Sequence, residues 1–456
     1  MSILVFCVVV VMFMAFVLIS VTTVKAQDFQ VKTLSFSSSL RDTVALGVLT
    51  NPEFRQVVHA QNAVRSRLDR AKALRRPTID LFGDIGYETT EDPFTRASPG
   101  SDSETLFRRQ VSFTVNQMLF DGHQTKYEIE RQRQQTNRAR LRVIATAEQL
   151  ALDIVNAYLN VTRQRELLKI TRQNVATHRR IYNRIEESVR AGRLSDVDLQ
   201  QITARLESAR ADEQRIYSDL KTAESAFKRV VGVFPQNLHK ADIPDAQLPG
   251  TLADMIDLAL AQNPLIQSAE KGVKVADAEL EQSKSPFYPQ IDLRLNARHA
   301  ANLGGIESSE DSLSALIVMT WDLYSGGEDK ARLQEFAFLK NVSMQDLAEQ
   351  IREVESNVRK SWARYQSAVQ RRINFAAQAQ NNKRLVDAYL DQFQIGRRSL
   401  LDVLDIQREY FVAQSNAVNE RTRGNRQVFT LLALKGALMP TLGIDYPDLV
   451  DYLYGS

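Results

Sequence analysis

Acidic and basic side chains gather in one short stretch of this chain, between Phe393 and Asp405. Asp402 and Asp405 are three residues apart, so in a helix they share one face. A turn between two helices needs Gly396 and an N-cap such as Ser399, but it does not need two Arg and two Asp within nine residues. The composition therefore indicates an electrostatic role. The alternative is that these charges only cap helices on an exposed turn.

The stretch has a counterpart earlier in the chain. Gly192, Ser195 and Asp198 each lie 204 residues before a residue of the same type. Each glycine separates two long runs that contain neither Gly nor Pro, a pattern that predicts a tight turn between antiparallel helices. The shared spacing indicates an internal duplication.

Nothing in the sequence has the pattern of an active site or a metal centre. None of the five histidines has the spacing of a metal-ligand pair, and neither a glycine-rich phosphate loop nor a nucleophile motif is present. The single cysteine, Cys7, lies in the N-terminal segment, so we expect no disulfide and no thiolate metal site. We therefore expect a protein that is not an enzyme and that has no cofactor.

Residues 1–26 have the features of a signal peptide. Residues 3–21 are apolar apart from Ser20, and Ala26 offers a small residue at the cleavage point. The competing interpretation is a retained anchor, because the apolar run is long enough to span a membrane. The polar continuation after Ala26 favours cleavage. Cys7 lacks the context of a lipidation site, so no lipid anchor is expected.

The elements that carry the two turns follow the same order in two repeats, residues 27–232 and 251–436. The predicted strands fall at about 78–88, 111–120, 290–298 and 313–322. The predicted long helices fall at 123–191, 193–231, 328–395 and 397–435. A further helix precedes the strands of each repeat and should be kinked or restarted near Pro52 and Pro264.

The longest runs without Gly or Pro have 69 and 68 residues, so each would reach roughly 100 Å as a straight helix. Their apolar residues are sparse, which suits a coiled coil or the wall of a tube rather than a globular core. Residues 233–250 and 437–456 leave the helical pattern and contain prolines. We expect them to form a linker and a C-terminal segment that pack around the middle of the helices.

The first three predicted strands alternate apolar and polar residues, and the fourth alternates less cleanly, which together predict a sheet with one apolar face. One interpretation is a half-buried sheet in a soluble protein. The other is a transmembrane barrel, favoured by the strand lengths and by aromatic residues near the strand bases. Four strands cannot close a barrel, so several chains would have to contribute. The expected aromatic girdle consists of Phe120, Tyr288, Trp321 and Tyr324.

The arginine-rich run 131–142 could indicate nucleic-acid binding. It has few aromatic residues, however, and the formal net charge of the chain is only +3. Because the run falls in a helix just below the expected membrane segment, a solvated or tunnel-facing helix wall is favoured. No nucleic-acid partner is expected.

The whole arrangement resembles the TolC family of outer-membrane efflux and secretion channels. The residues that carry the resemblance are Leu260–Pro264, Phe287–Asp292, Leu323–Gly327 and Gly396–Asp405. The resemblance implies a mostly α-helical protein with an α-helical barrel in the periplasm. It also implies a homotrimer whose three sets of four strands form a 12-stranded barrel in the outer membrane.

The resemblance also implies site residues. Asp402 and Asp405 correspond to acidic rings at the periplasmic entrance, which would select cations and raise their own pKa values by repulsion. Arg398 and Phe393, with Asp198, correspond to a latch of the closed state. The family pattern has Tyr where this chain has Phe393, so one hydrogen bond of that latch is missing.

The function expected from this resemblance is a passive outer-membrane duct for type I protein secretion or small-molecule efflux, with protein secretion preferred. Its partners would be a periplasmic adaptor, an inner-membrane transporter of the ABC or RND type, and outer-membrane lipid. The alternatives are a periplasmic coiled-coil protein without a pore, opposed by the amphipathic strands, and an enzyme on the same scaffold.

Overall fold

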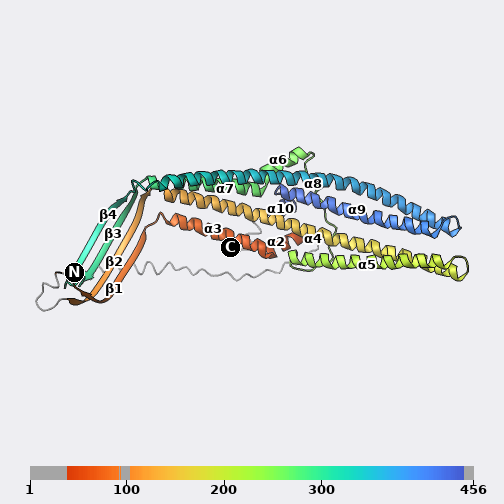
Figure 1. Ribbon diagram of the computed structural model, residues 1–456, viewed down its shortest axis with the longest axis horizontal. Coiled ribbons are helices and arrows are strands. Elements are labelled where there is room, and N and C mark those ends of the chain that lie inside the picture. The colour runs from red at the N-terminus through yellow and green to blue at the C-terminus, as the bar shows by residue number, and fades with distance from the viewer. Residues whose placement is uncertain (1–38, 92, 94–102, 446–456) are drawn as a thin grey trace.

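The computed structural model describes residues 39–91, 93 and 103–445. The chain forms a long rod of helices with a four-stranded sheet at one end (Figure 1). The 1–26 segment and residues 446–456 of the expected C-terminal segment lie outside the described residues.

The same order of elements occurs twice along the chain. The first set is α2 (Leu40–Thr50), α3 (Pro52–Ala73), β1 (Thr78–Thr90), β2 (Glu104–Asp121), α4 (Gln124–Arg190) and α5 (Asp196–Val231). The second set is α6 (Leu252–Gln262), α7 (Pro264–Gln282), β3 (Gln290–Ala301), β4 (Ser309–Thr320), α8 (Glu328–Gln394) and α9 (Leu400–Leu434). Short helices complete the order: η3 (Asp245–Gln247), η4 (Ser285–Phe287) and α10 (Leu438–Thr441).

The first helix of each set is interrupted at proline, as expected. Pro52 and Pro264 begin new helices, and the preceding Asn51 and Asn263 serve as N-caps whose side chains accept backbone N–H groups. The amide of Asn263 also donates to the carbonyl of Leu434 at 2.8 Å, at the end of α9. The break therefore fixes the short helix against the end of a long one.

The sheet is antiparallel with the order β1-β2-β3-β4. All four strands differ from their predicted bounds. The largest differences are that β2 begins at Glu104 rather than 111 and that β4 spans Ser309–Thr320 rather than 313–322. β1 and β3 continue to Thr90 and Ala301 rather than ending at 88 and 298. The residues added to β2 and β4 are mostly polar or charged, so they lack an apolar alternation, but they pair in register, as Thr105 does with Thr89. Backbone pairing rather than side-chain burial holds them in the sheet.

The two faces of the sheet differ in chemistry. On the polar face, Asn296 donates to Thr114 at 2.9 Å and Arg294 to Asn116 at 3.3 Å. On the other face, large apolar side chains stand in the open, with Ile85 74% and Leu313 85% exposed. Such a face needs an apolar environment to cover it.

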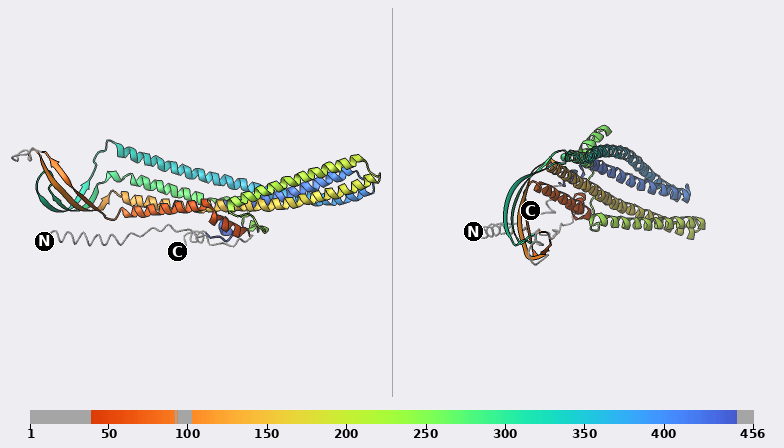
Figure 2. Two further views of the ribbon diagram at one scale, coloured as in Figure 1. Left: turned by 90° about the horizontal axis from the view of Figure 1, so that it is seen from below. Right: turned by 60° about the vertical axis from the view of Figure 1, so that its left-hand side comes forward.

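The main hydrophobic core lies at the middle of the rod, where α2, α4, α5 and the end of α9 meet. Residues of the linker 233–250 and of α10 pack into it, including Leu238, Ile243, Leu438 and Met439. The hydroxyl of the fully buried Tyr158 donates to the carbonyl of His239 at 2.6 Å. The linker and the described part of the C-terminal segment, residues 437–445, thus pack at the middle of the helices. Figure 2 shows the rod of helices, with the sheet at one end, from two further directions.

Among the described residues, no helix is both long enough and apolar enough to cross a membrane.

Candidate functional site

The two helical hairpins end in matching turns at the end of the rod far from the sheet. Gly192 and Gly396 have φ values of +69° and +70°, a conformation that glycine adopts without strain. Ser195 and Ser399 begin the following helices, each within a capping box. The local sequence therefore builds the same turn twice.

The capping boxes use two of the predicted site residues, Asp198 and Asp402. The Ser399 hydroxyl donates to the Asp402 carboxylate at 2.8 Å, and the Ser399 backbone N–H donates to the same oxygen at 3.3 Å. These bonds, with a smaller contribution from Arg398, lower the pKa of Asp402 below its ordinary value. Asp198 makes the equivalent bonds to Ser195. Within one protomer, both carboxylates are therefore helix caps.

Asp405 has a different partner. Its carboxylate lies 3.1 Å from the guanidinium of Arg205, which belongs to α5 of the other hairpin. The sequence alone does not point to Arg205, because its counterpart 204 residues later is Glu409 and the pairing arises only when the hairpins pack together. This ion pair is a direct polar link between the hairpins close to their turns.

Arg398 makes its contacts within its own hairpin. Its guanidinium stacks on the ring of Tyr389 at 4.0 Å, donates to Gln392 at 3.1 Å and lies 3.8 Å from Asp402. Within the described part of this protomer no contact joins it to Asp198, so the latch between them stays a prediction for neighbouring chains.

A small hydrophobic cluster, here called the tip core, joins both hairpins above the turns. It consists of Ile181, Ile185, Ile202, Leu400, Val403 and Leu404. Phe393 packs against this cluster, partly buried. His178 is buried just above it on α4, where loss of hydration lowers its pKa. Phe393 therefore has a packing role that needs no hydroxyl group.

Aromatic side chains mark the junction of sheet and helices. His123 lies between Phe120 and Tyr288, with ring centroids 5.4 and 6.1 Å apart in edge-on contacts. Trp321 and Tyr324 are 49% and 87% exposed. Their exposure at the strand bases suits an interfacial girdle, which stays a prediction.

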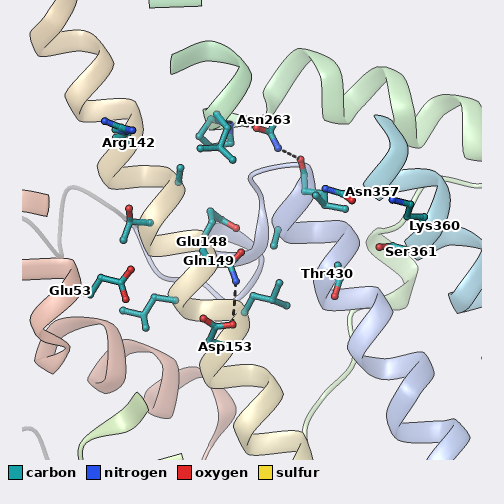
Figure 3. Close-up of a pocket in the computed structure, with 18 of the residues that line it drawn as sticks. Glu53, Arg142, Glu148, Gln149, Asp153, Asn263, Asn357, Lys360, Ser361 and Thr430 are labelled. Atoms are coloured by element: carbon teal, nitrogen blue, oxygen red, sulfur yellow. Dashed lines mark hydrogen bonds between the residues drawn. The ribbon is translucent and has the colours of Figure 1, made fainter. Parts of the chain in front are cut away.

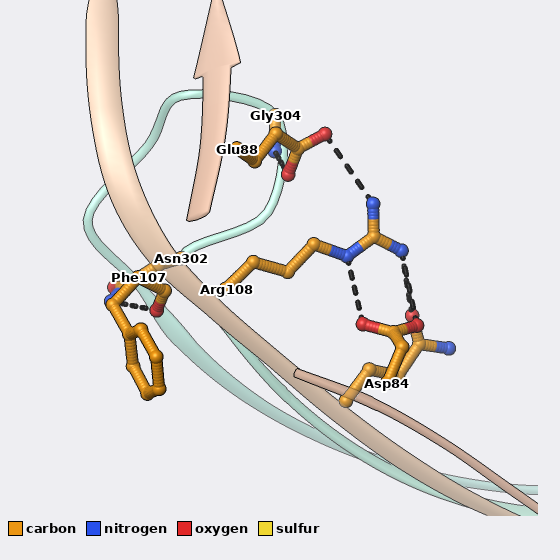
Figure 4. A network of polar contacts seen from close by, with 7 residues as sticks. Asp84, Glu88, Phe107, Arg108, Asn302 and Gly304 are labelled. Carbon is orange, nitrogen blue, oxygen red and sulfur yellow. Dashed lines mark hydrogen bonds and ion pairs between the residues drawn. The ribbon is translucent and has the colours of Figure 1, made fainter. Parts of the chain in front are cut away.

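At the opposite end of the strands, a polar network fixes the outer loop (Figure 4). The guanidinium of Arg108 on β2 binds the Asp84 carboxylate at 2.9 and 3.2 Å and approaches Glu88 at 3.4 Å. Glu88 accepts the backbone N–H of Gly304, and Asn302 donates to the carbonyl of Phe107 at 3.0 Å. The β3–β4 loop is therefore bonded to both strands of the first hairpin.

A cavity of about 540 Å³ lies where the two repeats meet at the middle of the rod (Figure 3). Its wall mixes charges of both signs, among them Glu53, Asp153 and Lys360. The buried Glu148 carboxylate accepts the backbone N–H groups of Leu438 and Met439 at 2.9 and 3.1 Å. That acid thus anchors α10. No cluster of His, Cys, Asp or Glu suited to a metal ion occurs within residues 39–91, 93 and 103–445.

The sequence matches the model of a family described as outer membrane efflux protein, at residues 48–233 and again at 255–437. The chain belongs to the outer membrane efflux protein family. The match covers most of the chain and includes both hairpins.

Individual relatives agree with this assignment. The outer membrane efflux protein BepC of Brucella suis is 23% identical over 75% of this chain and 73% of its own length. The alkaline protease secretion protein AprF of Pseudomonas aeruginosa is 24% identical over 88% and 84%. The solvent efflux pump outer membrane protein SrpC of Pseudomonas putida is 26% identical over 78% and 75%.

Solved structures show the same fold. CusC superposes with a TM-score of 0.78 at 17% identity, over 91% of this chain and 96% of that one. VceC of Vibrio cholerae gives a TM-score of 0.76 at 15% identity, over 88% and 96%. The expected fold, helical hairpins with four strands per chain for a tunnel and barrel, is thereby confirmed.

Membership in the family sets the broad function. This family member is an outer-membrane channel of an export system and not an enzyme. Such channels are components of tripartite efflux and secretion systems, so its partners include an adaptor and an inner-membrane transporter. The alternative of a coiled-coil protein without a pore is not favoured.

Proposed function

We propose that three copies of this chain form a homotrimer with a 12-stranded barrel and one continuous helical tunnel. The supporting observation is that, among the described residues, β1 and β4 each pair with a single strand, so both edges of the sheet are open to further pairing. The exposed apolar face of the strands then contacts outer-membrane lipid. Native mass spectrometry of the mature protein in detergent tests this, and a monomer as the largest species contradicts it.

The tunnel is closed at the helical turns and opens there on docking with the adaptor and transporter. Asp402 and Asp405 line the entrance as acidic rings, and the Arg205–Asp405 ion pair holds the hairpins of each protomer together. Across neighbouring chains, Arg398, Asp198 and Phe393 form the latch. This arrangement makes the turns both the narrowest point and the point of control.

Planar-bilayer conductance of the mature protein tests the entrance directly, beside a double variant Asp402→Ala and Asp405→Ala. Cation-selective channels that lose selectivity in the double variant support the acidic entrance. If the double variant forms channels with the native selectivity, the protein is still a duct, but its constriction lies at other residues. Trimeric protein that forms no channels contradicts the proposal.

The cargo is protein, exported by a type I system with an ABC transporter rather than small molecules driven by an RND pump. The support is the alignment with a protease secretion protein over 88% of this chain, although solvent pump components are also among the relatives. A deletion strain that loses its large secreted proteins but keeps its tolerance of detergents agrees with this. A strain that still secretes and becomes detergent-sensitive reverses it.

The chain arose by duplication of a half-molecule, residues 27–232 and 251–436, each with strands and helices in the same order. Two tandem matches to one family model and two 67-residue helices, α4 and α8, support this. The signal segment 1–26 is removed on export, which N-terminal sequencing of the mature protein tests.

A further inference from the structure

A second cavity, of about 600 Å³, lies among α3, α4, α7 and α8 in the half of the rod next to the sheet. Arginine dominates its wall. Arg67 and Arg70 come from α3, and Arg131 and Arg138 come from α4. Against these four guanidinium groups the cavity wall presents one carboxylate, that of Glu279. The cavity therefore carries an excess of positive charge.

The existing ion pairs do not neutralise this charge. Arg131 is bound by Glu128 at 2.8 Å and approaches Glu279 at 3.5 Å. Among the described residues, no ion pair involves Arg67, Arg70 or Arg138. The Nε atom of Arg138 is moreover buried without a hydrogen-bond partner within that part of the chain. A buried guanidinium donor without an acceptor is unfavourable, and an anion bound in the cavity would supply that acceptor together with opposite charge.

The backbone makes room for this arrangement at Gly272 of α7. A Cβ atom at that position would lie 3.5 Å from Cζ of Arg138, which is van der Waals distance, so the guanidinium packs closely against α7. Guanidinium groups bind phosphate, sulfate and carboxylate through paired hydrogen bonds, which suits a site for multiply charged anions.

The position of the cavity argues against a lipid headgroup as its occupant. Arg131 and Arg138 follow the end of β2 at Asp121 by 10 and 17 residues, or about 15 and 25 Å along a helix. The polar layer of one leaflet is only about 5 to 8 Å thick, so both residues lie beyond it. The cavity wall takes residues from four neighbouring helices, α3, α4, α7 and α8. In the proposed closed ring of helices, a site shared by four neighbours belongs on the concave face of the ring, which is the tunnel.

We propose that this arginine cavity is an anion-binding station in the tunnel that holds clustered carboxylate, sulfate or phosphate groups of the cargo on its way to the barrel. The proposal rests on the proposed tunnel. It assigns a preference for anions to the half of the tunnel next to the barrel, whereas the acidic entrance at the turns prefers cations. Cargo with anionic groups is thereby favoured once it has passed Asp402 and Asp405.

Block of the channel current by tripolyphosphate, added from the barrel side, tests the proposal. The variant is Arg70→Gln with Arg138→Gln, and the matched control is Arg133→Gln with Arg140→Gln, two exposed arginines of α4 outside the cavity wall. We expect block of the native channel that weakens as salt rises, and at least tenfold weaker block in the cavity variant. The control pair and the Asp402→Ala, Asp405→Ala channel should keep the native block.

Calorimetric titration of the detergent-solubilised trimer with tripolyphosphate separates this inference from the tunnel itself. Binding that is lost in the cavity variant and kept in the control supports the anion site. If the same protein conducts no current, the missing current counts against the proposed duct but not against the anion site. Channels that conduct but are not blocked by tripolyphosphate overturn the proposed station in the tunnel. Tripolyphosphate binding to a conducting channel without block of its current overturns it too. Equal block in the cavity and control variants overturns it as well. Size-exclusion chromatography confirms that each variant remains trimeric.

Discussion

At the scale of single residues, the helix-cap role of Asp402 and its proposed role in an acidic ring have opposite effects on its pKa. As a helix cap it is stabilised in its charged form by Ser399, which lowers its pKa. In an acidic ring, repulsion from its copies would raise that pKa. Because the folded pKa of the cap is lowered, the stabilisation is complete above the ordinary pKa and is lost as pH falls through the lowered one.

We predict that Ser399→Ala raises the pKa of Asp402, because the carboxylate loses its hydroxyl donor. Cation selectivity in planar bilayers should then disappear at a higher pH than in the native channel. Ser195→Ala is the matched control, since it removes the same bond from Asp198, which is outside the acidic ring. An identical pH profile for native and Ser399→Ala channels would exclude the link between cap and ring.

At the scale of elements, the hairpins are held together near their turns by the tip core and by one ion pair. Arg205 and Asp405 are 35% and 54% exposed, so their pair is worth only about 0.2–1 kcal/mol. A contribution of that size suits a link that breaks in the proposed opening of the tunnel.

Arg205→Ala should therefore raise the ratio of open to closed channels by up to about fivefold, the equivalent of 1 kcal/mol. Bilayer recordings of open probability measure this change. The double exchange Arg205→Asp with Asp405→Arg restores the pair with its charges reversed, and should return the channel to its native closure. A double variant as open as Arg205→Ala would show that the pair does not hold the hairpins.

The bonds from Glu148 to the start of α10 are a second contact that acts between elements. Glu148 is 3% exposed and accepts two backbone N–H groups, so Glu148→Ala leaves both donors without that acceptor and is expected to destabilise the segment by about 2–4 kcal/mol. Limited proteolysis should then cut the chain after α9. Glu148→Gln keeps an acceptor oxygen and should be cut more slowly. Equal resistance in all three proteins would contradict this.

At the scale of the whole molecule, the sequence predicted what depends on local pattern and missed what depends on packing. The long helices, the proline restarts and the capped turns follow from spacing and composition near Pro52, Gly192 and Gly396. The partner of Asp405 did not, because Arg205 is 200 residues away along the chain. The early start of β2 was missed because its first residues are mostly polar and are held by strand pairing and by cross-strand contacts such as that of Arg108 with Asp84.

Contact between the apolar face of the sheet and membrane lipid is also a property of the whole assembly, and β4 offers a direct test. Ile317 lies on the apolar face and is 72% exposed in one chain, whereas Ser314 is three residues away on the polar face. Lys on the lipid side of a membrane strand costs about 2–4 kcal/mol near the bilayer centre, and much less in a water-filled interior.

We therefore predict that Ile317→Lys reduces the amount of trimer in purified outer membranes. Ser314→Lys should insert normally and change only the conductance. Equal insertion of both variants would mean that the exposed apolar face is not covered by lipid, and the barrel would have to be abandoned for a sheet that packs against protein.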